Sequence, residues 1–206
     1  MQEINVRELV GLISSTAPVP GGGSVAALSG AFAAALSAMV GGLTAGKKGY
    51  ETVWPQMAEI TAKGKELQYK LLEAMDADAA SFDSFMSALS LPRGTEEEKA
   101  ARRAAMEAAL KEASLAPLNT AKLAAEVFPL AEAVVRSGNK NAVTDGLVAA
   151  MLARASVLGA LLNVKINLGS IRDQDFASDL RRACLELQEH AVMEEKRILD
   201  LAPELK

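Results

Sequence analysis

The chain has 206 residues, of which 50% are hydrophobic, 23% charged and 4% aromatic, and its formal net charge is −4 at pH 7. This length suits one domain with a buried core, so we treat residues 1–206 as a single domain. The acidic balance gives no reason to expect nucleic acid as a partner. The single cysteine, Cys184, excludes a disulfide framework and a cysteine-based metal cluster.

The first predicted element is a short amphipathic helix over residues 2–14, which the prolines at positions 18 and 20 cannot continue. No basic segment precedes an apolar one as in a signal peptide, so we expect a cytoplasmic protein.

The second predicted helix combines a stripe of large apolar residues with small residues on the rest of its surface. Ser24 stands where its N-cap belongs. Residues 25–43 are long enough to span a membrane, but twelve of these nineteen are Ala, Gly or Ser. A buried central helix explains this composition better than a membrane span.

Further along the chain, the same period predicts helices over residues 52–89, from Thr95 to near Pro117, over 117–136 with a bend at Pro129, over 141–168 and over 173–201. Strand-like alternation is missing throughout the sequence. The predicted fold class is therefore all-α: a single-domain bundle of six or seven helices around the buried small-residue helix.

The glycine run before the second helix has two interpretations. A nucleotide-binding P-loop needs a preceding strand and a Gly-Lys-Ser/Thr ending, and the sequence has neither. Gly21, Gly22, Gly23 and Ser24 can leave backbone N–H groups at a helix N-terminus, where they bind an anion or a carbonyl. The alternative is a tight turn between closely packed helices.

The helix over residues 141–168 carries a polar stripe on an otherwise apolar surface. Its members are separated by 11, 7 and 4 residues and share one side of the helix: Asp145, Ser156, Asn163 and Asn167. A solvated stripe would normally contain Lys and Glu. We therefore favour a stripe that faces a ligand cavity or bonds a neighbouring helix.

Basic and amide residues flank this helix and the second one. Asn139, Lys140 and Asn141 precede the polar-stripe helix at its positive end, and Lys47 and Lys48 form an adjacent pair in a glycine-bounded loop. The lysines are either solvated or placed to receive a carboxylated ligand.

Carboxylates on the helix over residues 52–89 are candidates for acid–base chemistry. Asp76 and Asp83 share a face, and Asp78 lies off it. Burial would raise a carboxyl pKa and suit a general acid, whereas ordinary exposure is the alternative for Asp78 and Asp83. His190 lies among glutamates and is expected at the surface.

Five segments in this order resemble the formiminotetrahydrofolate cyclodeaminase / methenyltetrahydrofolate cyclohydrolase family: PVPGGGSVAALSGAFAAALSAMV, LTAGKKGYE, DADAASFDSFM, GNKNAVTDGLVAAMLARAS and ALLNVKINLGSI. They extend from residue 16 to about residue 176. The resemblance implies an all-α homodimer of the free-standing bacterial form, with a tetrahydrofolate derivative as substrate and no metal or other cofactor.

The cyclodeaminase of this family closes 5-formiminotetrahydrofolate to 5,10-methenyltetrahydrofolate with release of ammonia, and this is the activity we expect. The cyclohydrolase, which opens the methenyl ring to 10-formyltetrahydrofolate, is the alternative on the same scaffold. A non-catalytic helical interaction module is a third hypothesis, based on the small-residue helix and the charged last helix.

The resemblance suggests roles for the residues singled out above. Asp145 is the first candidate for the catalytic carboxylate and Asp76 the second. Ser156, Asn163 and Asn167 would orient the pterin, and the glycine turn would border the folate groove. The remaining candidates for substrate binding, above all for the anionic and possibly polyglutamylated tail, are Lys47, Lys48, Asn139, Lys140 and Asn141.

Overall fold

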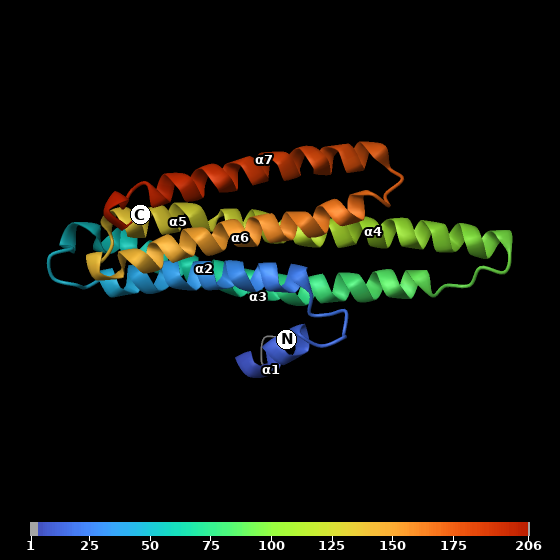
Figure 1. The fold of residues 1–206 in the computed structure, drawn as a ribbon, viewed down its shortest axis with the longest axis horizontal. Helices are drawn as coiled ribbons and strands as arrows, with labels where there is room; N and C mark the ends of the chain where they lie inside the picture. Colours follow the sequence, from blue (N-terminus) through green and yellow to red (C-terminus); the bar gives the residue numbers. More distant parts are fainter. Residues whose placement is uncertain (1–3, 206) are drawn as a thin grey trace.

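A computed structural model describes residues 4–205, which form a helical bundle (Figure 1). The helices within this range are α1 (Val6–Ile13), α2 (Gly22–Thr44), α3 (Trp54–Leu89), α4 (Glu96–Ala125), α5 (Val127–Ser137), α6 (Val143–Leu168) and α7 (Gln174–Leu199). Short 3-10 turns cover Glu51–Val53, Lys140–Ala142 and Pro203–Leu205. The predicted all-α fold class is confirmed.

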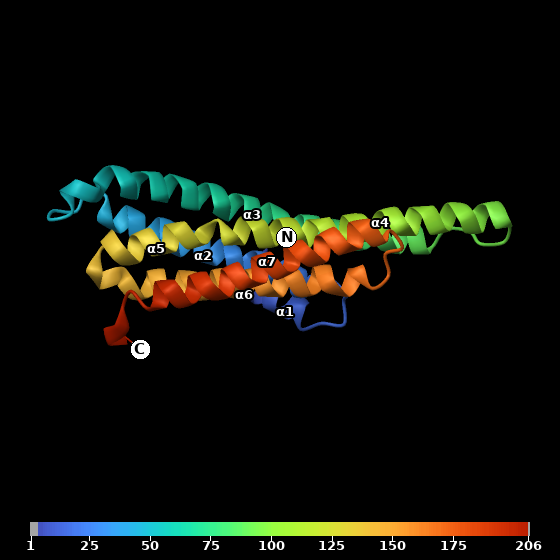
Figure 2. The same cartoon turned by 90° about the horizontal axis from the view of Figure 1, so that it is seen from above.

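Helix α2 lies at the centre of the bundle, where it packs mainly against α3 and α6 and also touches α4 and α5 (Figures 1 and 2). Small residues make this close packing possible. A Cβ atom at Gly30 would lie 2.7 Å from Ser156 Oγ of α6, and one at Gly64 of α3 would lie 2.9 Å from the Ala34 carbonyl oxygen. The prediction of a buried small-residue helix is therefore confirmed.

The side chains on the two sides of α2 differ in size. The buried residues are Gly, Ala or Ser with the exception of Val40 and Thr44, whereas Val25, Phe32, Met39 and Leu43 are 39–50% exposed. Close packing against α3 and α6 leaves no room for larger side chains, so these lie on the outer side of the helix.

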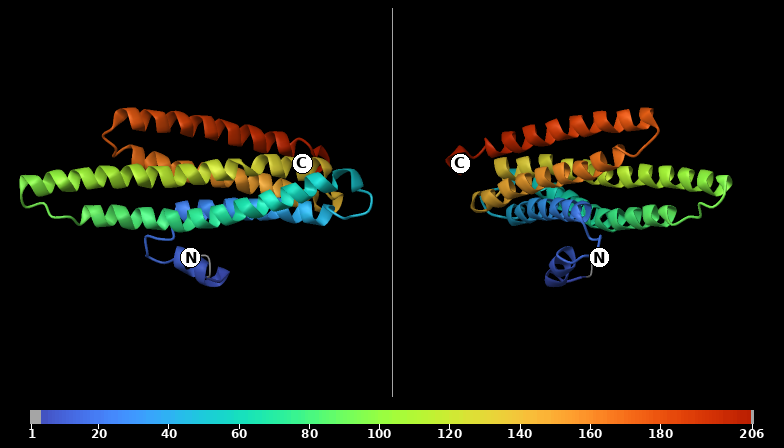
Figure 3. Two further views of the ribbon diagram at one scale, coloured as in Figure 1. Left: turned by 180° about the vertical axis from the view of Figure 1, so that it is seen from behind. Right: turned by 45° about the vertical axis from the view of Figure 1, so that its right-hand side comes forward.

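Helix α7 covers the outer side of α6, and the α3–α4 hairpin extends beyond the other helices at one end (Figure 3). Helix α1 stands apart from the bundle, and none of its residues belongs to a core cluster. The main core cluster is formed by α2 to α7.

Several helix ends follow the sequence signals. Thr95 is the N-cap of α4, and Thr95 and Glu98 form a reciprocal capping box. Pro55 lies in the first turn of α3, where no intrahelical N–H is needed.

The predicted helix over residues 117–136 is wrong. Helix α4 continues through the buried Pro117 to Ala125, and a new helix, α5, begins at Val127. Pro129 lies in the first turn of α5 instead of bending a longer helix, because a proline there loses no intrahelical hydrogen bond. Tertiary packing around Pro117 has outweighed its local preference.

Two helical segments, Gly22–Thr44 and Lys140–Leu168, are long and apolar enough to cross a membrane by length and composition. In the bundle, 56% and 44% of the residues in their most apolar windows are buried. The core helix of a soluble protein passes the same test, so this finding is weak evidence for a membrane.

Candidate functional site

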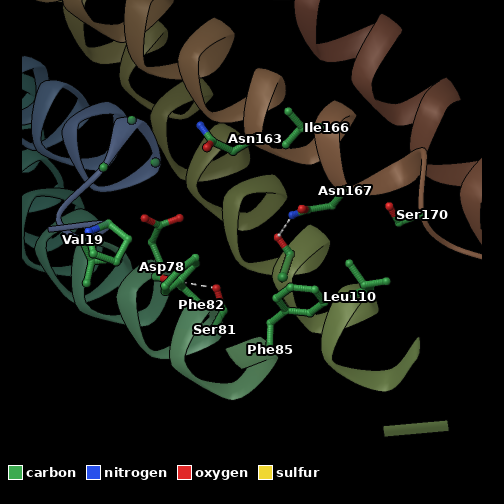
Figure 4. A pocket seen from close by; sticks show the side chains of 15 residues that line it. Val19, Asp78, Ser81, Phe82, Phe85, Leu110, Asn163, Ile166, Asn167 and Ser170 are labelled. Atoms are coloured by element: carbon green, nitrogen blue, oxygen red, sulfur yellow. Dashed lines mark hydrogen bonds between the residues drawn. The ribbon is translucent and has the colours of Figure 1, made fainter. Parts of the chain in front are cut away.

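A cavity of about 440 Å³ lies at the N-terminus of α2. Its walls come from the segment before α2, from the second half of α3, from the middle of α4 and from the end of α6 (Figure 4). The polar side chains that line it are Asp78, Ser81, Asn163, Asn167 and Ser170, and the larger apolar ones are Val19, Phe82, Phe85, Leu110 and Ile166. This volume is in the range of small-molecule sites.

The Asp78 carboxylate caps α2 from the neighbouring helix α3. Ser24 Oγ donates a hydrogen bond to Asp78 Oδ2 over 3.0 Å, and the Ser24 backbone N–H also binds this carboxylate. The N-cap residue itself, Gly21, has no side chain to offer. The prediction of Ser24 as the N-cap is therefore wrong: Ser24 is the third residue of the helix, and its buried hydroxyl is a donor instead of a cap acceptor.

Burial raises the pKa of the Asp78 carboxyl above its ordinary value, and the two hydrogen bonds from Ser24 partly oppose this shift. The Asp78 carboxyl therefore holds its proton more strongly than an exposed aspartate does. A carboxyl group of this kind is a candidate for proton transfer to and from a ligand in the cavity.

The glycine run allows close packing and also borders the cavity. Gly23 is buried, and a Cβ atom there would overlap the Asp78 carboxylate, so this position requires glycine for close packing. Gly21, Gly22 and Gly23 also line the cavity at the first turn of α2. The N–H groups of a first helical turn have no partner within the helix, and the positive end of the helix dipole lies at this region.

Two amides of α6 line the same cavity. Asn163 Nδ2 donates to the Gly159 carbonyl at 2.9 Å, and Asn167 Nδ2 donates to the Ala113 carbonyl of α4 at 2.7 Å. These bonds hold the amides in fixed orientations and leave each side-chain oxygen as an acceptor for a ligand. In Figure 4, Asp78 points toward the first turn of α2, and Asn163 and Asn167 reach the cavity from α6.

Ser156, the second predicted member of the polar stripe, lies elsewhere. Its side chain is fully buried against Gly30 of α2, does not line the cavity, and has no hydrogen-bond partner among the described residues. Within the stripe, Ser156 therefore packs against α2, whereas Asn163 and Asn167 line the cavity.

The predicted basic and amide cluster lies at the opposite end of the bundle. Lys47 Nζ donates to Asn139 Oδ1 at 2.9 Å and lies over the Tyr50 ring, whose hydroxyl accepts from the Lys140 N–H. These residues adjoin the C-terminus of α2, which has 23 residues and is about 34 Å long. Lys48 and Asn141, both exposed, belong to the same end, so this chain does not bring the predicted lysines to the cavity.

Neither predicted catalytic carboxylate lines the cavity. Asp145 lies in the first turn of α6, eighteen residues or about 27 Å before Asn163. Asp76 precedes Asp78 by two residues, which turns its side chain roughly 200° away around α3. The carboxylate in the cavity is Asp78, which the sequence analysis had left open as an exposed residue.

A helical spacing could have identified more of this site. Ser81 and Phe82 follow Asp78 by three and four residues, Phe85 follows Asp78 by seven, and together they form one face of α3. The pairing of this face with α4 and the α2 N-terminus was not visible in the sequence. His190 is exposed, as predicted, with its ring edge-on to Phe128.

Between residues 4 and 205 no group of three or more His, Cys, Asp or Glu side chains is arranged to hold a metal ion. The one titratable side chain that lines the cavity is Asp78. The site can therefore support proton transfer by a carboxyl group, hydrogen bonding to amide-like edges and contact with an aromatic ligand.

Comparison with known proteins gives consistent matches. A profile described as formiminotransferase-cyclodeaminase matches residues 5–186. The chain is 42% identical over 167 residues to the methenyltetrahydrofolate cyclohydrolase of Methylorubrum extorquens, covering 81% of this chain and 80% of that protein. It is 33% identical over 195 residues to the formimidoyltransferase-cyclodeaminase of Sus scrofa, covering 95% of this chain but only 36% of that longer protein.

The crystal structure of formiminotetrahydrofolate cyclodeaminase from Thermotoga maritima has the same fold. It matches with a TM-score of 0.88 and 29% sequence identity, over 99% of this chain and 98% of that one. The sequence profile, the relatives and the fold agree. The chain belongs to the formiminotransferase-cyclodeaminase family.

Proposed function

We propose that this protein is a cytoplasmic enzyme of folate one-carbon metabolism that converts 5-formiminotetrahydrofolate to 5,10-methenyltetrahydrofolate and ammonia. The observation that carries the proposal is the partly buried Asp78, whose pKa is raised, in a cavity with two oriented amides and an aromatic wall. Family membership supplies the substrate class.

Asp78 would transfer the protons of the reaction. Substrate N10 attacks the carbon of the protonated formimino group, forms a C–N bond and loses its proton to the carboxylate, which leaves an amino group on that carbon. The protonated carboxyl then gives a proton to the amino group on the same carbon, the bond to that group breaks, and ammonia leaves. A carboxyl whose pKa is raised suits both steps, because it can hold the proton between them.

The rest of the cavity has groups that suit a folate. The pterin edge presents amide-like donors, for which the oxygens of Asn163 and Asn167 are acceptors. Phe82 and Phe85 offer aromatic contact for the ring systems. Once the bridge carbon becomes cationic, the negative Asp78 carboxylate would stabilise it.

The cyclohydrolase reaction is a second candidate, favoured by the 42% identity to a protein of that name over four fifths of both chains. Here water attacks the methenyl carbon and loses a proton to the Asp78 carboxylate. The carboxyl gives this proton to N5 as the C–N5 bond breaks, and the hydroxyl on the carbon releases its own proton to solvent, so that 10-formyltetrahydrofolate forms with net release of one proton. The same carboxylate serves because both reactions move a proton at the same carbon.

Two assays separate these activities. Purified protein is supplied with 5-formiminotetrahydrofolate, with ammonia as the readout, and separately with 5,10-methenyltetrahydrofolate, with its absorbance as the readout. Ammonia release supports the cyclodeaminase, and turnover of the methenyl compound alone supports the cyclohydrolase. A thermal-shift titration with reduced folates covers the third hypothesis: a protein with no shift and no turnover is a non-catalytic module.

The proposal includes a homodimer, a substrate with a polyglutamate tail and no resident cofactor. Exposed apolar residues on α2 and α6 support the dimer. Comparing KM for substrates with one and with several glutamates tests the tail, and sedimentation velocity tests the dimer. Turnover that is unchanged after treatment with a metal chelator is expected if the enzyme has no resident metal cofactor.

A further inference from the structure

The loop between α6 and α7, residues 169–173, is bound by a carboxylate of α4. The Arg172 N–H donates to Glu107 Oε1 at 3.0 Å and to Oε2 at 3.2 Å, and the Asp173 N–H donates to Oε1 at 3.1 Å. Hydrogen bonds from backbone N–H groups to a carboxylate are charge-assisted and are stronger than neutral ones. Glu107 therefore fixes the backbone of the α6–α7 loop directly before α7 begins.

A second contact from α4 acts on α7 itself. Lys111 Nζ lies 2.6 Å from Asp173 Oδ2 and 5.1 Å from the centre of the Phe176 ring. Asp173 is the N-cap of α7, and its Oδ1 accepts from the Phe176 N–H at 3.1 Å. Lys111 thus anchors the first turn of α7 through side chains, whereas Glu107 binds the loop through its backbone.

The part of α4 that carries Glu107 also forms one wall of the cavity. Leu110 and Ala113 follow Glu107 by three and six residues, on the same side of the helix, and both line the cavity. The Ala113 carbonyl accepts from Asn167 Nδ2 of α6 at 2.7 Å. This side of α4 therefore binds the α6–α7 loop at one position and a cavity amide less than two turns further along.

The segment that α4 holds in this way lines the cavity. Asn167, at the end of α6, and Ser170, in the loop, both lie in its wall, and the Ser170 N–H donates to the Asn167 carbonyl at 3.0 Å. Figure 4 shows these two residues and Leu110 across the cavity from Asp78. The wall that Glu107 supports is therefore separate from the carboxylate proposed for proton transfer.

We infer that Glu107 is a positioning residue of the substrate site. By holding the backbone of the α6–α7 loop, it keeps Ser170 and the Asn167 amide in the arrangement that receives the substrate. This inference rests on the proposed function and adds to it a residue that does not itself line the cavity. The Asp78 carboxylate is held independently by Ser24, so the loss of Glu107 should weaken substrate binding and leave the chemical step nearly unchanged.

Steady-state kinetics with the folate that the wild type converts test this role. For Glu107→Ala we expect KM to rise about tenfold, the equivalent of one lost charge-assisted hydrogen bond, and kcat to stay within about twofold. Glu107→Gln keeps an oxygen that can accept from the loop N–H groups, so it should recover most of the wild-type KM. Glu107→Asp, which is shorter by one methylene group, should behave like Glu107→Ala although it keeps the charge.

Lys111→Met is the matched control on the same side of α4. It removes the ion pair with Asp173 and leaves the three Glu107 hydrogen bonds in place, so its KM should be that of the wild type. Circular dichroism and thermal melts show whether each variant is folded and how much stability it has lost. An unchanged KM in the folded Glu107 variants, or an equal rise in KM for Lys111→Met, would overturn the inference.

A double variant with Asn167→Ala separates positioning from a loss of stability alone. If Glu107 acts through this wall, the effects of Glu107→Ala and Asn167→Ala on binding overlap, and the double variant binds more tightly than the product of the two effects predicts. The probe is tetrahydrofolate, which carries no one-carbon group to react, and its Kd is measured by titration calorimetry. Independent, multiplicative effects would overturn the role of Glu107 in positioning this wall.

The binding measurement distinguishes failure of this inference from failure of the proposed function. A wild type that binds tetrahydrofolate but converts neither folate removes the proposed activity, and the Kd values still decide the role of Glu107. An active wild type whose Glu107 variants keep normal KM and Kd values retains the function and overturns the inference.

Discussion

Ser24 Oγ lies 3.0 Å from Asp78 Oδ2, and this bond joins the first turn of α2 to the second half of α3. Among residues 4–205, Asp78 is the only titratable side chain in the cavity wall. The carboxylate serves two purposes at once. It caps a helix whose N-cap residue is glycine, and it faces the space that a ligand would occupy. The following variants separate these two roles.

Asp78→Asn keeps the shape of the side chain and removes its charge. We expect kcat to fall by about 10²–10⁴-fold, the typical contribution of a positioned acid or base. Asp83→Asn, on an exposed side of the same helix, should retain wild-type turnover. Steady-state assays with both folates measure the two variants. Full activity of Asp78→Asn would show that the carboxylate is only a helix cap.

The same variant has an expected effect on stability. Because burial raises the folded-state pKa of Asp78, the ionised carboxylate destabilises the folded protein at neutral pH. This cost is fully present above the folded pKa and disappears below the unfolded value of about 3.8. Asp78→Asn should therefore melt at the wild-type temperature or above at pH 7. Any advantage should vanish by about pH 3.5 in thermal melts, below that unfolded value.

Ser24→Ala removes a hydrogen bond that favours the ionised form of Asp78. The pKa of the carboxyl should rise further, so the acidic limb of the pH–kcat profile should move to higher pH. The loss of stability should be about 1 kcal/mol. Ser29→Ala is the control, because Ser29 binds the Leu152 carbonyl and not Asp78. An unshifted profile for Ser24→Ala would contradict the coupling.

Gly23→Ala and Gly22→Ala form a matched pair in the glycine run. A Cβ atom at position 23 would overlap the Asp78 carboxylate, whereas one at position 22 would make an ordinary contact 3.8 Å from Asn163 Nδ2. We expect Gly23→Ala to lose most activity and Gly22→Ala to retain most of it. Assays at saturating substrate compare their kcat values, and equal loss in both variants would rule out the steric explanation.

An acid transition should involve α5 and α7. Arg197 and Arg136 hold the pKa of Glu132 at about 2, and Arg197 connects the two helices through this carboxylate. Because the folded-state pKa is lowered, the stabilisation is present above the unfolded value of 4.5 and is lost as the pH falls toward 2. Glu132→Gln should flatten the fall in melting temperature between pH 5 and pH 2, while Glu59→Gln, an exposed residue of α3, should not.

The sequence by itself determined the helical class, most helix boundaries and the central position of α2. Periodicity, capping residues and small side chains act over a few residues, and their effects can be read locally. Thr95 with Glu98 and the glycines of α2 are examples. The family resemblance in the sequence also gave the substrate class.

Only the tertiary structure decided which carboxylate meets the glycine turn. Asp76, Asp78 and Asp145 are all plausible on their own helices, and the packing of α3 against the N-terminus of α2 brings Asp78 alone to the cavity. The lysine cluster is distant for the same reason, since a helix of 23 residues separates its two ends by about 34 Å. Hydrophobic periodicity identifies a helix face, but the choice of the neighbour that it meets depends on how the whole bundle packs.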